Sequence, residues 1–178
     1  MKRFYINLLL ILLITALAAC DRDPKSEKLK ASFTAYNLRF QLPEGWHEDD
    51  ANSDMDIYGG RGFASPEYAG RTYLRFHQGA GFAVLGGWEP AEDATAILEA
   101  SFAFDISEQT SIRVLGYDGT YAHGKIDQGQ GIGAVHMTYE DENGDLQQLA
   151  FVGVVANYWE EFEPTFLEII GGLQFENG

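Results

Sequence analysis

Residues 111–158 constrain the fold more than any other part of the chain, because they alternate in hydrophobicity between short turn signals. Asp118-Gly119 predicts a hairpin turn, and Asn143-Gly144 is an even stronger hairpin signal. We expect strands at 111–117, 120–127, 132–139 and 146–158, with the glycine-rich residues 128–131 as a loop. Turns this short join antiparallel neighbours, so the sequence predicts an antiparallel meander.

Apolar spacing predicts one helix before this meander and one after it. The first is expected to start at Glu89-Pro90, because proline suits the first helical turn, and Glu92 and Asp93 would lie near its positive end. Its predicted inner stripe is Ala94, Ile97, Leu98, Ser101 and Phe102. The second helix is expected at 159–173, with Phe162, Phe166, Ile169, Ile170 and Leu173 facing inward and Pro164 early enough to be tolerated.

Period-two alternation predicts further strands in the first half of the chain. They are expected at 36–42, 57–64, 71–77 and 82–87. Pro43-Glu44-Gly45-Trp46 should end the first of them with a turn and an aromatic plug, and Trp88 and Trp159 are also expected to be core plugs. Strands, helix, meander and helix in this order predict an α+β fold: an antiparallel sheet of about six to seven strands covered by two main helices.

The first nineteen residues have the three zones of a signal peptide. Lys2 and Arg3 precede an apolar run at 8–14, and Leu17-Ala18-Ala19-Cys20 ends in small residues. This ending resembles the lipobox of bacterial lipoproteins, which implies lipid attachment at Cys20. The apolar run is too short to cross a membrane, which takes about 20 residues. The open alternative is an ordinary secretory signal in which Cys20 is incidental.

These features divide the chain into a signal peptide (1–19), a lipidated Cys and flexible tether (20–31) and one domain (32–178). The lipid would hold the domain on the periplasmic side of a bacterial membrane. Asp21 resembles an inner-membrane retention signal and favours that membrane weakly.

Net charge restricts the possible partners. Residues 20–178 contain all 27 acidic residues and ten of the 12 basic ones, so their formal net charge is −17 with His neutral. Such a domain repels nucleic acid and anionic lipid head groups. It favours a basic partner, or the charge only keeps the domain soluble. The single Cys of the chain leaves no disulfide framework, so the core must hold by packing.

Both ends of the predicted domain resemble PsbP-like and DcrB-like domains. The start, Tyr36-Asn-Leu38-Arg-Phe40-Gln-Leu42-Pro43-Glu-Gly45-Trp46, is similar to their first strand and turn. The ending from Phe166 to Phe175 is similar to their closing helix and short last strand, although Gly171-Gly172 stands where a Ser is often found. Members include a photosystem II lumenal subunit, bacterial envelope lipoproteins, a nuclear Ran-binding protein and chaperones of secreted toxins. The resemblance therefore implies binding without catalysis, and it transfers no catalytic residue.

Candidate metal and catalytic motifs are incomplete. The acidic loop at 47–56 spaces Asp50, Asn52, Asp54 and Asp56 like a calcium loop, but Met55 and Arg61 stand where an EF-hand needs Gly and a carboxylate. The four His are His47, His77, His123 and His136, and they form no helical pair; His123 and His136 lie on neighbouring predicted strands. No activated nucleophile is apparent, since the chain lacks G-x-S-x-G. We expect no enzyme, no cofactor and no metal.

The segment 58–73 is the speculative binding site. It contains Tyr58, Arg61, Phe63, Tyr68, Arg71 and Tyr73, and Tyr and Arg are favoured at interface hot spots. The alternative is a loop whose aromatic rings fold back on the core. We expect a membrane-anchored, non-catalytic protein-binding or accessory module, and the negative charge favours a basic protein partner. Alternatives are an immunity protein against a secreted toxin, a metal-binding lipoprotein, or a hydrolase whose polar cleft would include Arg75 and His77.

Overall fold

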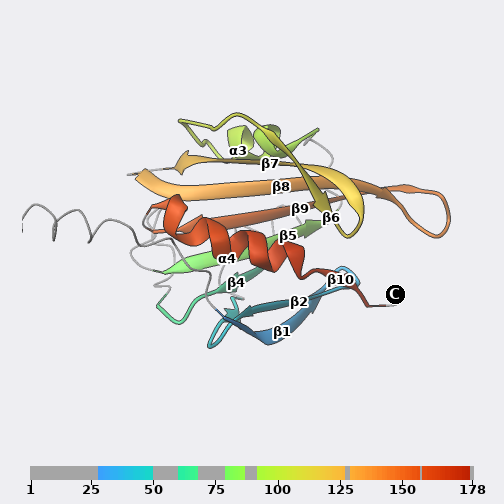
Figure 1. The fold of residues 1–178 in the computed structure, drawn as a ribbon, viewed down its shortest axis with the longest axis horizontal. Helices are drawn as coiled ribbons and strands as arrows, with labels where there is room; N and C mark the ends of the chain where they lie inside the picture. Colours follow the sequence, from blue (N-terminus) through green and yellow to red (C-terminus); the bar gives the residue numbers. More distant parts are fainter. Residues whose placement is uncertain are drawn as a thin grey trace, which may run out of the picture.

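The computed structural model describes residues 28–49, 60–67, 79–86, 92–126, 129–156 and 158–176. Within these ranges the chain forms two helices and ten strands in two antiparallel sheets (Figure 1). The expected α+β class is confirmed, with more strands than the six to seven predicted. The helices and strands are β1 (Leu29–Ala35), β2 (Leu38–Pro43), β3 (His47–Glu48), β4 (Gly60–Ala64), β5 (Ala80–Gly86), α3 (Ala94–Ala100), β6 (Thr110–Val114), β7 (Tyr117–Ile126), β8 (Gln130–Glu140), β9 (Leu146–Val155), α4 (Trp159–Gly171) and β10 (Gln174–Phe175).

The large sheet has seven strands in the order β3-β4-β5-β9-β8-β7-β6. Its centre is the meander predicted from the sequence, with β7, β8 and β9 paired in register over most of their length. The small sheet has the order β1-β2-β10, so the short strand after α4 pairs with β2. That final strand was implied by the family resemblance and is confirmed.

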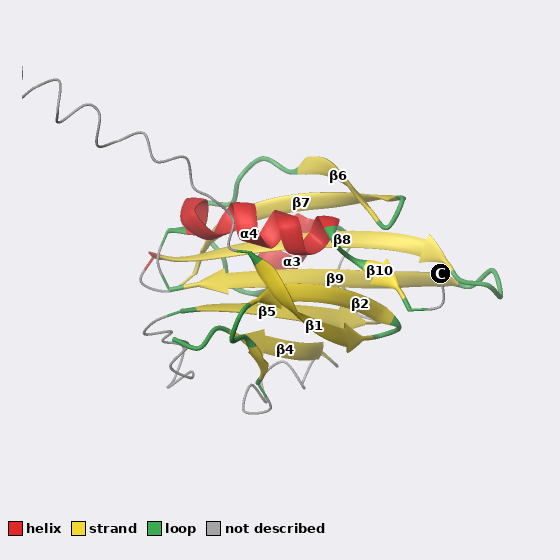
Figure 2. Cartoon of the chain, turned by 60° about the horizontal axis from the view of Figure 1, so that its bottom comes forward, coloured by secondary structure: helices red, strands yellow, loops and turns green. Residues whose placement is uncertain are grey.

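Each face of the large sheet has its own core. On one face, α3 packs over β7 and β8, and its buried residues Ala94, Ile97 and Leu98 meet small and branched side chains of the sheet. On the other face, α4 packs on β7, β8 and β9 and contacts β2 of the small sheet, and Figure 2 shows α4 and β1 in front of the large sheet. Because side chains alternate along a strand, β8 and β9 supply both cores at once.

α4 follows its predicted apolar spacing. Phe162, Phe166, Ile169 and Ile170 are buried, and each such side chain contributes about 1.5–3 kcal/mol relative to an exposed one. Trp46 is 6% exposed and stacks on Phe162 with ring centroids 6.0 Å apart, as expected of an aromatic plug.

Trp159 reaches the sheet because the strands beneath it carry glycine. A Cβ placed on Gly133 would lie 2.1 Å from the Trp159 ring, and one on Gly153 would lie 2.6 Å from the Phe166 ring. Two bare backbone positions therefore let the rings of α4 lie directly on β8 and β9. Trp159 is 3% exposed, which confirms its prediction as a core plug; Trp88 lies outside the described residues.

The turn predicted at Asp118-Gly119 is in the wrong place. Leu115 and Gly116, not Asp118-Gly119, form the β6–β7 turn, with φ of 55° and 90° as a type I′ turn requires. Gly119 belongs to β7, where a Cβ would lie 2.6 Å from the carbonyl oxygen of His136. Glycine is therefore needed at this position because β7 and β8 lie so close together.

The first predicted strand is really the second arm of a hairpin. Tyr36 and Asn37, with φ of 54° and 60°, form a turn between β1 and β2, so the strand starts at Leu38. β1 begins at Leu29, which lies in the segment that the sequence assigned to the tether.

The end of the first predicted helix is also wrong. α3 ends at Ala100, and Ser101 caps it through a side-chain hydrogen bond to the Ile97 carbonyl oxygen. Phe102 has φ of 57° and is 90% exposed, so Ser101 and Phe102 do not continue the inner stripe. Asp93 is the N-cap and accepts a 2.9 Å hydrogen bond from the Ala96 amide; Glu89 and Pro90 lie outside the described residues, as does the predicted strand 71–77.

Candidate interaction surface

Three aromatic side chains from three strands meet at one end of the α4 face. Tyr117 of β7 and Tyr139 of β8 have ring centroids 5.7 Å apart, and Tyr139 and Phe175 of β10 have centroids 5.3 Å apart. Both pairs are tilted by 50°. Tyr117 is 36% exposed, while Tyr139 and Phe175 are partly buried against the core. We call Tyr117, Tyr139 and Phe175 the aromatic row.

Strand geometry explains why these rings meet. The β7–β8 register pairs Gly119 with Met137, and the same register continued by two residues sets Tyr117 opposite Tyr139, where the two rings contact. β10 brings Phe175 alongside because it pairs with Leu38 of β2. The aromatic row is thus built from segments that are far apart in the sequence.

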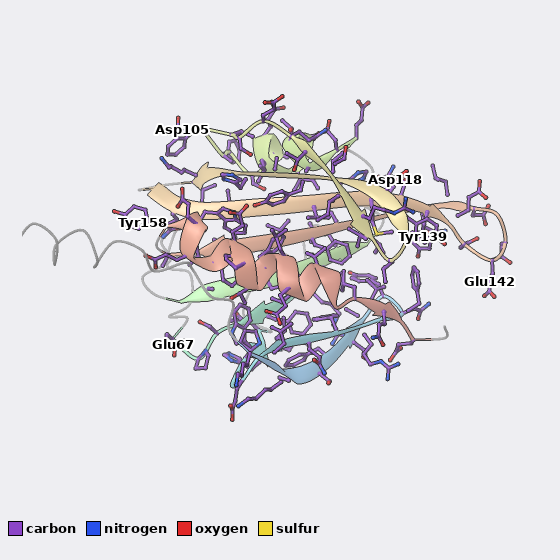
Figure 3. The ribbon with its side chains drawn as sticks, in the orientation of Figure 1. Glu67, Asp105, Asp118, Tyr139, Glu142 and Tyr158 are labelled. Atoms are coloured by element: carbon purple, nitrogen blue, oxygen red, sulfur yellow. The ribbon has the colours of Figure 1, made fainter. Side chains whose placement is uncertain are left out.

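Several carboxylates lie on or next to the segments that carry the aromatic row. They belong to Asp118, Glu140, Asp141, Glu142, Asp145 and Glu176. Asp118, Tyr139 and the hairpin-tip residue Glu142 lie at the same end of the molecule (Figure 3). Two cations are also near: Arg113 pairs with Asp118 at 3.4 Å, and Arg39 is exposed on β2. Acidic groups therefore outnumber basic ones at this end.

The β8–β9 hairpin that carries this charge is well ordered by its own hydrogen bonds. One carboxylate oxygen of Asp141 accepts from the amides of Asn143 and Asp145, at 2.9 and 3.0 Å. The other accepts from the Gln147 side chain at 3.0 Å. These bonds hold the pKa of Asp141 below its usual value. Burial, followed by the nearby charge of Asp141, raises the pKa of Tyr139, so its phenol stays neutral.

The chain enters the domain at the opposite end. Leu29 pairs with Pro43, and Gly45 of the following turn lies against Pro66. Ser65 and Ala80 are hydrogen bonded to each other, and Ala80 pairs with Val155 at the end of β9. Tyr158, which caps α4 and is 71% exposed, and Glu67 lie at this end in Figure 3.

The structure describes two of the six residues of the predicted 58–73 site. Arg61 of β4 makes a two-oxygen ion pair with Glu48 of β3 and donates at 3.0 Å to the Thr34 carbonyl oxygen of β1. Phe63 is 1% exposed and packs between Phe33 and Phe40. Tyr58, Tyr68, Arg71 and Tyr73 lie outside the described residues, as do Cys20 and residues 50–56 of the acidic loop.

His123 and His136 occupy opposite faces of the sheet. His136 is 5% exposed on the α3 face beside Gln148, and burial lowers its pKa. His123 stacks on Trp159 on the α4 face, with centroids 6.4 Å apart. Within the described ranges no group of three His, Cys, Asp or Glu residues is close enough to hold a metal ion. No helix in that part of the chain has the length and apolarity to span a membrane.

A polar trio of Tyr121, Trp159 and Glu163 lies beneath α4. The Tyr121 hydroxyl accepts from Trp159 Nε1 at 2.9 Å and donates to Glu163 Oε1 at 2.5 Å. Burial, and next the bond to Glu163, raises the pKa of Tyr121 far above its usual value. A phenol that holds its proton so firmly is a poor acid or base, so this trio serves to attach α4 to β7.

Comparison with solved structures identifies the fold. The Ran-binding protein Mog1p of Saccharomyces cerevisiae superposes with a TM-score of 0.51 at 9% identity, over 85% of this chain and 97% of Mog1p. The domain has the Mog1p fold. This Mog1p-like architecture is the one that the PsbP/DcrB resemblance implied, and that expectation is confirmed.

Two further structures are similar at lower scores. The solution structure of cyanobacterial PsbP from Synechocystis sp. PCC 6803 has a TM-score of 0.46 at 12% identity, over 82% of this chain and 91% of that one. A protein of Bacteroides thetaiotaomicron gives 0.44 at 12% identity, over 81% of this chain and 47% of its own. No protein-family model matches the sequence. No curated protein sequence matches it either.

Sequence reasoning did not single out the aromatic row. Tyr139 has the same parity on β8 as the core residues Val135 and Met137, which places it on the α4 face. It also directly precedes the acidic hairpin turn, so an aromatic residue beside a charged tip was a usable signal. Phe175 could not be connected to it, because nothing local shows that β10 pairs with β2.

Proposed function

We propose that this chain is a lipid-anchored, non-catalytic protein-binding module of a bacterial envelope. The observation that carries the binding role is the aromatic row, a set of partly exposed rings at an end of the domain where acidic residues outnumber basic ones. Tyrosine is enriched at the energetically dominant positions of protein interfaces. The fold agrees with such a role, since Mog1p is a Ran-binding protein.

The lipid anchor is proposed from the sequence around Cys20. Acylation there would hold the domain on the periplasmic side of a membrane, and Asp21 favours the inner one. Leu29 lies nine positions after Cys20, so the tether reaches at most about 30 Å. Because Leu29 lies at the end opposite the aromatic row, the row would face away from the membrane toward a partner.

The anchor is tested by metabolic labelling with an alkyne-bearing fatty acid. We expect the parent protein to incorporate the label and to sediment with membranes, whereas Cys20→Ala should do neither. Equal labelling of both proteins would remove lipid attachment at Cys20 from the proposal.

The binding role is tested in cells with a photo-crosslinking amino acid. It is introduced at Tyr117 in the aromatic row, at Tyr58 in the sequence-predicted segment and at Tyr158 as a surface control. We expect one partner to be captured reproducibly from Tyr117 or Tyr58 and not from Tyr158. Absence of a specific product at all three positions contradicts a protein-binding role.

A further inference from the structure

We propose that the aromatic row binds lysine and arginine side chains of a basic segment of a partner protein. This inference rests on the proposed function, because it names the chemistry of the partner for the same surface. The structural basis is a set of partly exposed rings, on segments that also carry carboxylates without an ion pair to any described residue, at the end of the domain opposite Leu29.

The rings supply the first part of the recognition. The faces of tyrosine and phenylalanine attract cations within about 6 Å of the ring centroid. The 50° tilts in the aromatic row give neighbouring rings different orientations, so a long side chain can lie over one ring and beside the next. The phenol of Tyr139 stays neutral, and it therefore adds a hydrogen-bonding group without a full charge.

The carboxylates supply the second part, but they are not equivalent. Asp118 is paired with Arg113, and Asp141 is occupied by the hairpin's own hydrogen bonds. Glu142 at the hairpin tip and Glu176 next to Phe175 make no ion pair with any described residue. Glu142 lies in the hairpin turn that follows Tyr139, and Glu176 directly follows Phe175, so both exposed groups belong to segments that carry the aromatic row and are open to an incoming cation.

Charge argues against the other occupants of an exposed apolar surface. Residues 20–178 have a formal net charge of −17, so a second copy of the chain would bring acid against acid. Anionic lipid would be repelled in the same way. A basic protein segment is the occupant that both the rings and the carboxylates favour.

The test measures binding of a defined basic probe to the purified full-length chain in uncharged detergent micelles. The probe is a fluorescein-labelled peptide of six Arg-Gly repeats, read by fluorescence anisotropy, and six Glu-Gly repeats serve as the negative control. Tyr117→Ala and Tyr139→Leu change the row, the second keeping apolar bulk without a ring face. Glu142→Gln removes one carboxylate.

Matched controls come from the opposite end of the molecule. Tyr158→Ala removes an exposed tyrosine and Glu67→Gln removes an exposed carboxylate there (Figure 3). We expect each row variant to weaken binding of the Arg-Gly peptide about two- to five-fold, from the strength of a surface cation–π contact. Glu142→Gln should weaken it at low salt and less at high salt. Both control variants should bind like the parent.

Four outcomes overturn the inference. One is equal weakening by the row variants and the control variants, which would show attraction to diffuse negative charge. Another is row-dependent binding to phosphatidylglycerol vesicles, and a third is dimerisation of the chain that Tyr117→Ala abolishes. A partner captured in cells whose crosslinking survives the row variants also refutes this inference, while leaving the protein-binding function intact. Thermal unfolding of each variant verifies that it is folded.

Discussion

Replacing Gly133 by alanine would drive a methyl group into the ring of Trp159. The added Cβ would lie 2.1 Å from Cζ2 and 2.5 Å from Cη2 of the indole, where carbon atoms normally approach to about 3.5–4.0 Å. The indole cannot simply move, because it is 3% exposed, is hydrogen bonded to Tyr121 and packs against Phe162 and Phe166.

The expected cost follows from this confinement. Overpacking a core typically costs 1–3 kcal/mol, and a rigid ring held on several sides puts Gly133→Ala at about 3 kcal/mol. For a domain of this size that corresponds to a fall in melting temperature of roughly 6–12 °C. The matched control is Gly171→Ala at the last residue of α4, where a Cβ meets nothing within 4 Å. It should leave stability unchanged or raise it by about 0.5–1 kcal/mol.

Urea unfolding followed by far-ultraviolet circular dichroism measures these free energies without relying on the Trp159 fluorescence. A double-mutant cycle with Trp159→Leu tests the cause. Leucine lacks the ring atoms that the methyl would strike, so Gly133→Ala should cost less than about 1 kcal/mol in that background. A cost below about 1 kcal/mol in the parent, or the same cost in both backgrounds, would refute the reasoning.

Three other substitutions test individual features of the structure. Tyr121→Phe should lower the free energy of unfolding by about 1–3 kcal/mol, because the buried Nε1 of Trp159 loses its acceptor; urea unfolding within about 0.5 kcal/mol of the parent would contradict this. His136 has a lowered pKa in the folded state, so the unfolded chain binds its proton more tightly, and stability should fall as pH drops below 6.5 toward the folded-state pKa. His136→Gln should reduce that slope in unfolding curves between pH 7 and 5, and an unchanged slope would exclude His136 as its source. Phe102→Asn should raise stability by up to about 1 kcal/mol, since Phe102 is 90% exposed with φ of 57°, a conformation that Asn tolerates; a thermal shift downward would argue against it.

Local sequence signals determined most of the architecture. The Asn143-Gly144 turn is in the predicted place, because its signal depends only on the backbone preferences of adjacent residues. α4 begins at Trp159 as predicted, because its inner stripe extends over more than two turns. Both the turn and the helix are determined by residues that are close together in the sequence.

The errors occur where a residue type has two physical uses. Gly119 was predicted to be a turn residue, but it makes room for the neighbouring strand, and Gly116 supplies the turn. Phe102 fitted the helical spacing, yet α3 ends two residues earlier and leaves it exposed. Spacing cannot show which of two glycines faces a carbonyl oxygen, or where a helix loses its packing partner.

The candidate surface depends on long-range pairing, which the sequence does not display. Arg61 was expected to contact a partner protein. In the structure its guanidinium bridges the Glu48 carboxylate and the Thr34 carbonyl oxygen. A role of Arg61 in partner binding stays a prediction. Tyr139 and Phe175 become neighbours only when β10 is placed beside β2.

The position of β2 between β1 and β10 also affects when folding can finish. Leu38 cannot pair with Phe175 until the ribosome has added more than a hundred further residues. Pairs of residues this far apart in the sequence also slow folding. A nascent chain lacking residues 174–175 can form the β1–β2 hairpin but not the complete small sheet. If the chain is exported as we propose, this order of events would keep the small sheet from closing before residues 174–175 have crossed the membrane.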